Sequence, residues 1–280
     1  MSWTRAVRFI AKETKRVHLG QVRTSEDIAL LLESGKAVQV QELEGDLYSG
    51  QVTDTLLTID TILSPLESTG AIRCTGLNYI DHANEAGMPI PTDPVLFFKA
   101  GPALNGPGTV PIPRVCQDGS SDYEAELAIV LSRDAKDVPL ADAMDYVLGF
   151  TCANDISSRT LQLSSSQWCF SKSMDGSCPI GPTLVRPSTL PDHGAALPVR
   201  CLVNGTTVQD GTTADFIFSV QHLVHYFSKG STLQRGSLIL TGTPAGIGFF
   251  RQPRIVLRHG DDVRVQIPGI GTLINDIRYE

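Results

Sequence analysis

Three acidic residues, Glu124, Glu126 and Asp155, have the type and spacing of a cation-binding site. Residues 122–131 are predicted to form a β-strand, and residues two apart on a strand point to the same face, so Glu124 and Glu126 present adjacent carboxylates. Two like charges held close together are costly unless a cation neutralises them or one of them binds a proton. An all-oxygen set suits a hard divalent ion, so we predict Mg²⁺, with Mn²⁺ or Ca²⁺ as alternatives. The competing interpretation is a solvated strand face without an ion.

His82 and Glu85 lie three residues apart, which places them on one face of a helical turn. A carboxylate beside an imidazole raises its basicity and fixes its tautomer, so this pair is a candidate general base for a water molecule. Glycines and prolines flank the segment and make it a candidate mobile lid. A solvated surface pair is the alternative interpretation of the same spacing.

Further segments carry groups that could face a substrate. Arg159 offers a planar fork for a carboxylate or keto group, and Gln162 lies three residues further on. Lys172 precedes a turn rich in Gly and Pro and, beside a divalent ion, would help to hold a developing enolate. Thr243 lies in the Gly-rich turn at residues 241–248, whose hydroxyl and N–H groups could bind a substrate carboxylate. Taken alone, each group also fits an ordinary surface side chain or a plain turn.

Composition limits the class of protein. The chain has 280 residues, 41% of them hydrophobic, which suffices for one large domain with or without a small one. Its net charge is −7 and it has no basic stripe, so nucleic acid is not expected as a partner. No apolar run reaches membrane-spanning length, so no membrane partner is expected. Six cysteines without CxxC spacing indicate reduced thiols and favour the cytoplasm, with the mitochondrion as second choice because basic residues crowd the N-terminus.

The pattern of apolar residues predicts a β-rich chain in two blocks. Residues 1–70 form a small N-terminal domain, which begins with a strand hairpin and has a helix expected over residues 25–33. Residues 71–280 form the larger domain, in which Gly, Pro and Asn separate short strands and the Asn204, Gly205 pair indicates a hairpin. Strands are expected at residues 71–74, 95–98, 126–131, 199–203, 237–240 and 262–267, and helices at residues 140–146 and 215–226.

The Glu124–Glu126 segment, the His82–Glu85 segment and several further motifs, taken in their order along the chain, resemble those of the fumarylacetoacetate hydrolase superfamily, in particular its small domain-containing members. The resemblance runs from about Ile72 to Ile277. Two positions depart from the family pattern, Thr160 where an acid is common and Thr183 where an aromatic residue is common. The motifs that carry the resemblance are Gly76-Leu77-Asn78-Tyr79 with His82 and Glu85, Pro94-Val95-Leu96-Phe97-Phe98-Lys99, Asp122-Tyr123-Glu124-Ala125-Glu126-Leu127, Asn154-Asp155-Ile156-Ser157 with Arg159, Lys172-Ser173 through Pro182, Asn204-Gly205, Thr241-Gly242-Thr243-Pro244-Ala245-Gly246 and Gly269-Ile270-Gly271-Thr272-Leu273.

The resemblance implies a mainly β fold with some α, a mixed β-sandwich roll with a small N-terminal α/β domain, usually assembled as a homodimer. It also implies a site with three groups of residues, namely Glu124, Glu126 and Asp155 as ligands of Mg²⁺ or Mn²⁺, His82, Glu85 and Lys172 as catalytic groups, and Arg159, Gln162, Thr243 and Lys99 around the substrate.

The implied reaction is the metal-dependent cleavage of a C–C bond in a 2-oxo or 1,3-dioxo acid, as in an acylpyruvate hydrolase or an oxaloacetate decarboxylase, through a metal-stabilised enolate. The same enolate chemistry serves an oxaloacetate tautomerase or another keto–enol isomerase, which is the first alternative. A non-catalytic family member that binds a metabolite is the second. Retention of His82, Glu85 and the three acidic residues favours an enzyme.

Overall fold

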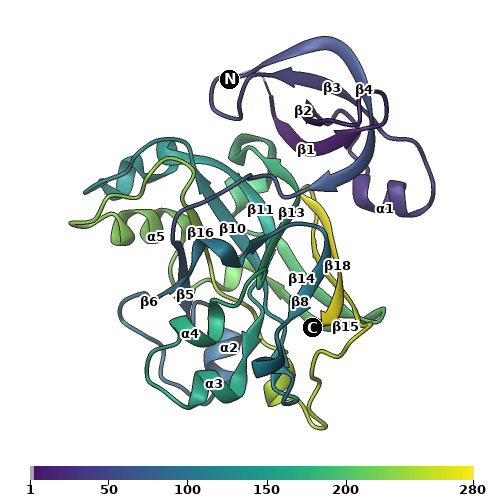
Figure 1. Ribbon diagram of the computed structural model, residues 1–280. Coiled ribbons are helices and arrows are strands. Elements are labelled where there is room, and N and C mark those ends of the chain that lie inside the picture. The colour runs from purple at the N-terminus through teal and green to yellow at the C-terminus, as the bar shows by residue number, and fades with distance from the viewer. Residues whose placement is uncertain (1–2) are drawn as a thin grey trace.

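The computed structural model describes residues 3–280 and shows two β-sheets with short helices around them (Figure 1). The larger sheet contains 11 strands, namely β1 (Arg5–Ala11), β2 (Val17–Gln21), β3 (Gln39–Glu44), β4 (Gln51–Leu63), β5 (Ile72–Gly76), β6 (Val95–Lys99), β7 (Leu104–Asn105), β10 (Ala125–Leu131), β11 (Val147–Asn154), β13 (Cys178–Val185) and β16 (Leu238–Leu240). Its order is β2-β3-β4-β1-β13-β11-β10-β16-β5-β6, and β7 pairs with β13.

The second sheet has five strands, in the order β15-β14-β17-β18-β8. Their bounds are β8 (Gly108–Ile112), β14 (Pro198–Val203), β15 (Thr206–Thr212), β17 (Asp262–Ile267) and β18 (Gly271–Tyr279), and a separate short pair joins β9 (Ser121–Asp122) to β12 (Ser157–Ser158). The α-helices are α1 (Ile28–Glu33), α2 (Ile80–Glu85), α3 (Arg159–Leu163), α4 (Cys169–Lys172) and α5 (Val220–Phe227). Short 3-10 helices are η1 (Gly101–Ala103), η2 (Arg114–Cys116), η3 (Leu140–Tyr146), η4 (Pro187–Thr189), η5 (Pro191–Gly194), η6 (Thr213–Asp215) and η7 (Gly248–Phe250).

The main hydrophobic core lies between the two sheets. Leu127 and Ile129 of β10 pack there with Val265 of β17. The intervening β10 residues Ala128 and Val130 face the opposite side and belong to a second buried cluster. Because side chains alternate along a strand, Glu124 and Glu126 lie on the same side as Ala128 and Val130. The strand is buried on both faces, so the solvated strand face considered for the sequence is wrong.

The N-terminal strands extend the larger sheet at one end (Figure 1). The expected hairpin is confirmed, since β1 and β2 pair antiparallel. β1 also pairs with β13 through Arg5 and Ala6. A third apolar cluster, which includes Phe9 and Ile28, gives this block a core of its own. The boundary between residues 70 and 71 stays a prediction.

Three expected elements are shifted or of a different type. The helix expected from residue 25 begins at Ile28, because Asp27 is its N-cap and accepts hydrogen bonds from the first-turn N–H groups. The helix expected from residue 215 is α5, which begins at Val220, because Ser219 caps it and the N–H of Phe218 donates to Asn78. The helix expected at residues 140–146 is of the 3-10 type.

The segment after Lys172, expected as a Gly- and Pro-rich turn, becomes a central strand of the larger sheet. β13 is buried throughout and pairs with both β11 and β1. Burial and pairing on both sides override the local turn preference of Pro179, Gly181 and Pro182. The register with β11 shifts between Phe150 and Cys152, as expected where prolines remove ladder donors.

Candidate active site

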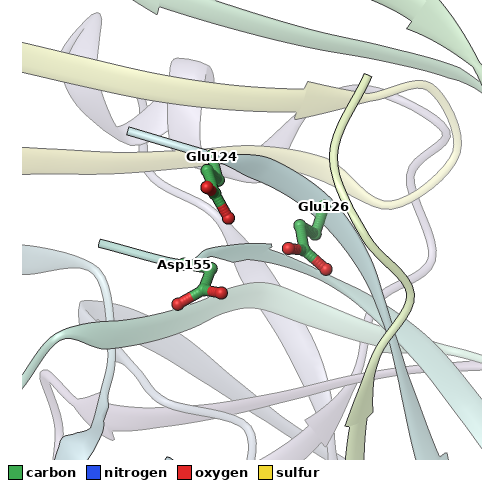
Figure 2. A group of neighbouring side chains, drawn as sticks. All are labelled: Glu124, Glu126 and Asp155. Atoms are coloured by element: carbon green, nitrogen blue, oxygen red, sulfur yellow. The ribbon is translucent and has the colours of Figure 1, made fainter. Parts of the chain in front are cut away.

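The three predicted acidic side chains converge at the ends of two paired strands (Figure 2). Glu126 lies on β10, Glu124 immediately precedes that strand, and Asp155 immediately follows β11. The N–H of Asp155 donates to the carbonyl of Glu124 at 2.9 Å, which continues the pairing past both strand ends. A carboxylate oxygen from each residue lies within 4.8 Å of the others, and all three side chains are buried. This all-oxygen group could hold a hard metal ion.

Lysine and arginine side chains hold two of these carboxylates. Glu124 accepts from Arg159 Nη1 at 2.6 Å and from Lys172 Nζ at 2.7 Å. Asp155 accepts from Lys172 Nζ at 2.9 Å and from Lys99 Nζ at 2.6 Å. Burial alone would raise the pKa of Glu124, but the charges of Lys172 and Arg159 outweigh it and lower that pKa. Glu124 is therefore ionised before any metal ion binds.

Glu126 has a different environment. Its Oε2 accepts from the N–H of Gly242 at 2.6 Å, and among residues 3–280 no basic side chain forms an ion pair with it. Burial, followed by the charges of Asp155 and Glu124, raises the pKa of Glu126 well above its usual value. A divalent ion would relieve this repulsion, so the charge balance and the donor set both fit a bound metal.

The turn at residues 241–248 holds acidic side chains of the protein. Besides the bond from Gly242 to Glu126, the N–H of Gly246 donates to Glu85 at 2.9 Å. Gly242 has φ +90°, and an added Cβ would lie 2.9 Å from the Cβ of Asn78, so only glycine fits this position. These backbone donors are thus used by the protein, whereas the sequence suggested that they bind a substrate carboxylate.

Thr243 reaches the cavity, but its hydroxyl is already engaged. It donates to the carbonyl of Ala125 at 2.9 Å and accepts from Gln209 Nε2 at 2.7 Å. These bonds tie the turn to the first residue of β10, next to Glu124 and Glu126. Thr243 therefore supports the shape of the cavity wall.

His82 and Glu85 form the predicted dyad on α2. His82 Nδ1 lies 2.9 Å from Glu85 Oε2, while the other oxygen of Glu85 accepts from Gly246. The Glu85 carboxylate is fixed by the turn and in turn orients the imidazole, whose Nδ1–H donates to it. His82 is only 9% exposed, which argues against a solvated surface pair.

A cavity of about 160 Å³ brings these groups together. One part of its wall is polar or charged and is formed by His82, Glu124, Glu126, Arg159, Gln162, Lys172 and Thr243. The rest is largely apolar and includes Leu77, Met88, Phe97, Leu163, Trp168, Ile247, Phe249 and Phe250. In Figure 1 the helices α2, α3 and α4, which supply several of these residues, lie together at one end of the larger sheet.

Lys99 lies away from the position that the resemblance implied. It is fully buried, and its Nζ donates to Asp155 and to the carbonyl of Ile156. As the last residue of β6, it approaches the acidic group from inside the protein rather than from the cavity wall. Its contacts fit a role in holding Asp155, not in binding substrate.

Asp122 is a site residue that sequence reasoning missed. Its carboxylate accepts from Arg159 Nε at 2.8 Å and from the N–H groups of Gly248 and Phe249 at 2.8 and 3.1 Å. Arg159 Nη1 also donates to Gln162, and Nη2 is buried without a partner among residues 3–280. Asp122 thus links the cavity-lining Arg159 to the aromatic wall. The spacing of two residues between Asp122 and Glu124 could have predicted that both side chains face the site. The sequence has no comparable pattern that predicts the aromatic wall.

The sequence model of the fumarylacetoacetate hydrolase C-terminal domain matches residues 71–278. The chain belongs to the fumarylacetoacetate hydrolase family. A caffeoylpyruvate hydrolase of Neonothopanus nambi is 41% identical over all of this chain and 94% of its own length. Oxaloacetate tautomerase FAHD2A of Homo sapiens, described as mitochondrial, is 38% identical over 78% of this chain and 69% of its own.

The crystal structure of a 2-hydroxyhepta-2,4-diene-1,7-dioate isomerase from Mycobacterium marinum matches 99% of both chains, with a TM-score of 0.82 and 32% identity. The expected fold, mainly β with some α, is confirmed. Hydrolase and tautomerase names among the relatives correspond to two of the reaction types expected from the sequence, and the chain is an enzyme of this family. No helix among residues 3–280 has the length and apolar character needed to cross a membrane.

Proposed function

We propose that this family enzyme is a metal-dependent hydrolase that cleaves the C–C bond of acylpyruvates, the 2,4-dioxo acids. One observation carries the proposal: His82, which is paired with Glu85, lines the same cavity as Glu124 and Glu126. Glu124, Glu126 and Asp155 would hold the ion, with Mg²⁺ preferred to Mn²⁺ or Ca²⁺. When bound, the ion would polarise the substrate oxygens and stabilise the negative charge of an enolate.

The dyad supplies the base for the hydrolytic step. His82 Nε2 takes a proton from a water molecule while Nδ1–H stays bonded to Glu85. The hydroxide adds to the carbonyl carbon farther from the substrate carboxylate. The resulting tetrahedral centre collapses, the adjacent C–C bond breaks, and its electron pair remains on the pyruvate fragment as an enolate. A proton then returns to that carbon, so one water yields pyruvate and a carboxylic acid.

Cationic side chains support charge development in this step. Burial alone would lower the pKa of Lys172, but Asp155 and Glu124 outweigh it and raise that pKa, so Lys172 remains an ammonium group beside the cavity. Its charge favours the enolate. The unpartnered Nη2 of Arg159 is a donor for the substrate carboxylate, and Gln162 holds the same guanidinium in place.

The test is cleavage of acetylpyruvate by the purified protein, with pyruvate and acetate identified by NMR. Chelator should abolish the activity and Mg²⁺ should restore it. The Glu124→Ala variant should be inactive at any Mg²⁺ concentration. Unchanged turnover after complete metal removal, or full activity of the variant, would contradict the proposal.

Oxaloacetate tautomerisation is the second candidate, supported by the names of several relatives. In that reaction only a proton moves, so the same cavity would serve without activating water. The apolar part of the wall weighs against it, since oxaloacetate carries a second carboxylate that this part cannot pair. Rapid oxaloacetate tautomerisation without acetylpyruvate cleavage would favour this candidate.

Assembly and location are part of the proposal. We expect a homodimer, which is supported by exposed apolar residues such as Val95, Leu96 and Phe170 near the edge strand β6. Light scattering on the purified protein tests this expectation. The cytoplasm stays our first choice of compartment, and relatives described as mitochondrial support the second. Imaging of the full chain would decide between them.

A further inference from the structure

A second cavity of about 530 Å³ lies next to the active-site cavity. Three residues, Arg159, Leu163 and Phe249, line both cavities, so they form the boundary between the two spaces. Polar groups contribute to the second cavity, among them Ser120, Thr160, Ser164 and Arg254. The proposed reaction does not use any of this space.

Phe249 is the boundary residue best suited to separate the two cavities. Arg159 is fixed by its bonds to Asp122 and Glu124, and the Leu163 side chain is mostly exposed. The Arg254 guanidinium, from the wall of the second cavity, lies 4.2 Å from the centre of the Phe249 ring. The Phe250 ring packs edge-on against Phe249 at 5.3 Å.

The backbone of Phe249 is also fixed, because its N–H donates to Asp122. The main chain therefore cannot move aside without losing a bond to a buried carboxylate. The ring contacts the Arg254 guanidinium and the Phe250 ring, and contacts of this kind contribute about 1 kcal/mol each. Replacing the ring should join the cavities without disturbing Arg159.

The volumes of the two cavities indicate how large a substrate fits on the active-site side of Phe249. An engineered cavity of roughly 150 Å³ binds one benzene molecule. The active-site cavity of about 160 Å³ therefore has room for a 2,4-dioxo acid head with a small acyl group. A ring-sized acyl group needs more space, and the second cavity beyond Phe249 provides it.

We propose that Phe249 limits the size of the acyl group that the enzyme accepts. The limit rests on the proposed acylpyruvate hydrolysis and identifies the residue that selects among acylpyruvates. Small acyl groups fit beside the apolar wall with the ring in place. Benzoyl and larger groups fit once the ring is removed and the second cavity becomes accessible.

The experiment compares kcat/KM for benzoylpyruvate and acetylpyruvate in wild type and in Phe249→Ala. We expect the ratio of benzoylpyruvate to acetylpyruvate to rise by about tenfold or more in the variant, the order of effect that a removed steric block gives. Val256→Ala is the matched control, because Val256 lines only the second cavity and its truncation leaves the Phe249 ring in place. Its ratio should stay near that of wild type.

An unchanged ratio in Phe249→Ala, or an equal rise in Val256→Ala, overturns the inference. Circular dichroism and thermal unfolding establish that each variant folds, and Phe249→Leu, which keeps an apolar side chain, should give a smaller rise. Calorimetric binding of oxalate and N-phenyloxamate in the presence of Mg²⁺ repeats the comparison without turnover. If wild type cleaves neither acylpyruvate, the proposed function fails. The size limit would still be supported if Phe249→Ala bound N-phenyloxamate more tightly than wild type does while its affinity for oxalate stayed the same.

Discussion

Replacement by glutamine in the metal-free protein should destabilise the fold at Glu124 far more than at Glu126. Glu124 accepts charged hydrogen bonds from Arg159 and Lys172. Removing one partner of a buried ion pair costs about 3–5 kcal/mol, because the remaining charge is left uncompensated. We therefore expect Glu124→Gln to lower the free energy of unfolding by about that amount.

Glu126 faces two acids, and within residues 3–280 the N–H of Gly242 is the one group that donates a hydrogen bond to it. A glutamine oxygen can accept the same bond, and the substitution removes a charge that burial and its neighbours disfavour. We expect Glu126→Gln to change the free energy of unfolding by about 1 kcal/mol or less, or to raise it.

The pH dependence follows from the raised pKa of Glu126. Above the ordinary value of 4.5, the unfolded chain releases the Glu126 proton while the native protein still holds it. Stability falls with rising pH wherever the native state binds more protons, so the metal-free wild type loses stability from about pH 4.5 upward until the folded pKa is passed. Glu126→Gln lacks this loss, and its advantage over wild type should grow across the same range.

The assay is urea unfolding followed by circular dichroism, with chelator and at several pH values, and then with Mg²⁺. Wild type should gain stability from Mg²⁺, and Glu126→Gln should gain much less because a ligand is missing. If Glu126→Gln is as unstable as Glu124→Gln in chelator, Glu126 is not the carboxyl group whose ionised form the site disfavours.

Three further substitutions test the site and the fold. His82→Ala should slow acylpyruvate cleavage by about 10²–10⁴-fold and oxaloacetate tautomerisation less, since only the first needs hydroxide; equal losses in the two assays would exclude the dyad as the source of hydroxide. Asp122→Asn should raise KM more than it lowers kcat in steady-state kinetics, because Arg159 loses a charged partner; an unchanged KM would count against this positioning role. Ser219→Ala should lower the free energy of unfolding by about 1 kcal/mol through loss of the α5 cap and leave kcat unchanged, and denaturant titration with kinetics checks both.

Local periodicity explains what the sequence could predict about this site. The pairing of Glu124 with Glu126 follows from strand alternation, and that of His82 with Glu85 from one helical turn. The proximity of Glu124 and Glu126 to Asp155 depends on the pairing of β10 with β11, which local periodicity does not predict. The resemblance supplied only the grouping of the three acids.

Tertiary contacts explain what could not be predicted. β13 has the Gly and Pro content of a turn, yet strands on both sides pair with it. Lys99 lies at the end of β6, and the order of the strands in the sheet decides on which side it approaches Asp155. The residues next to Lys99 in the sequence therefore do not predict that it lies behind the acidic group. The aromatic wall joins Phe97, Trp168 and Phe249 from three distant segments, and none of them has a local signal.

The basic side chains around the acidic group are compatible with a metal ion. Four carboxyl groups, those of Asp122, Glu124, Glu126 and Asp155, meet three cations, those of Lys99, Arg159 and Lys172. Glu126 is the carboxyl group without a cationic partner among residues 3–280, and burial with its acidic neighbours raises its pKa. Metal ligands must be deprotonated, and the cations already keep Glu124 in that state. An ion that binds these oxygens competes mainly with Lys172, which contacts both Glu124 and Asp155. The ammonium group released by that competition lines the cavity, where the enolate charge would form.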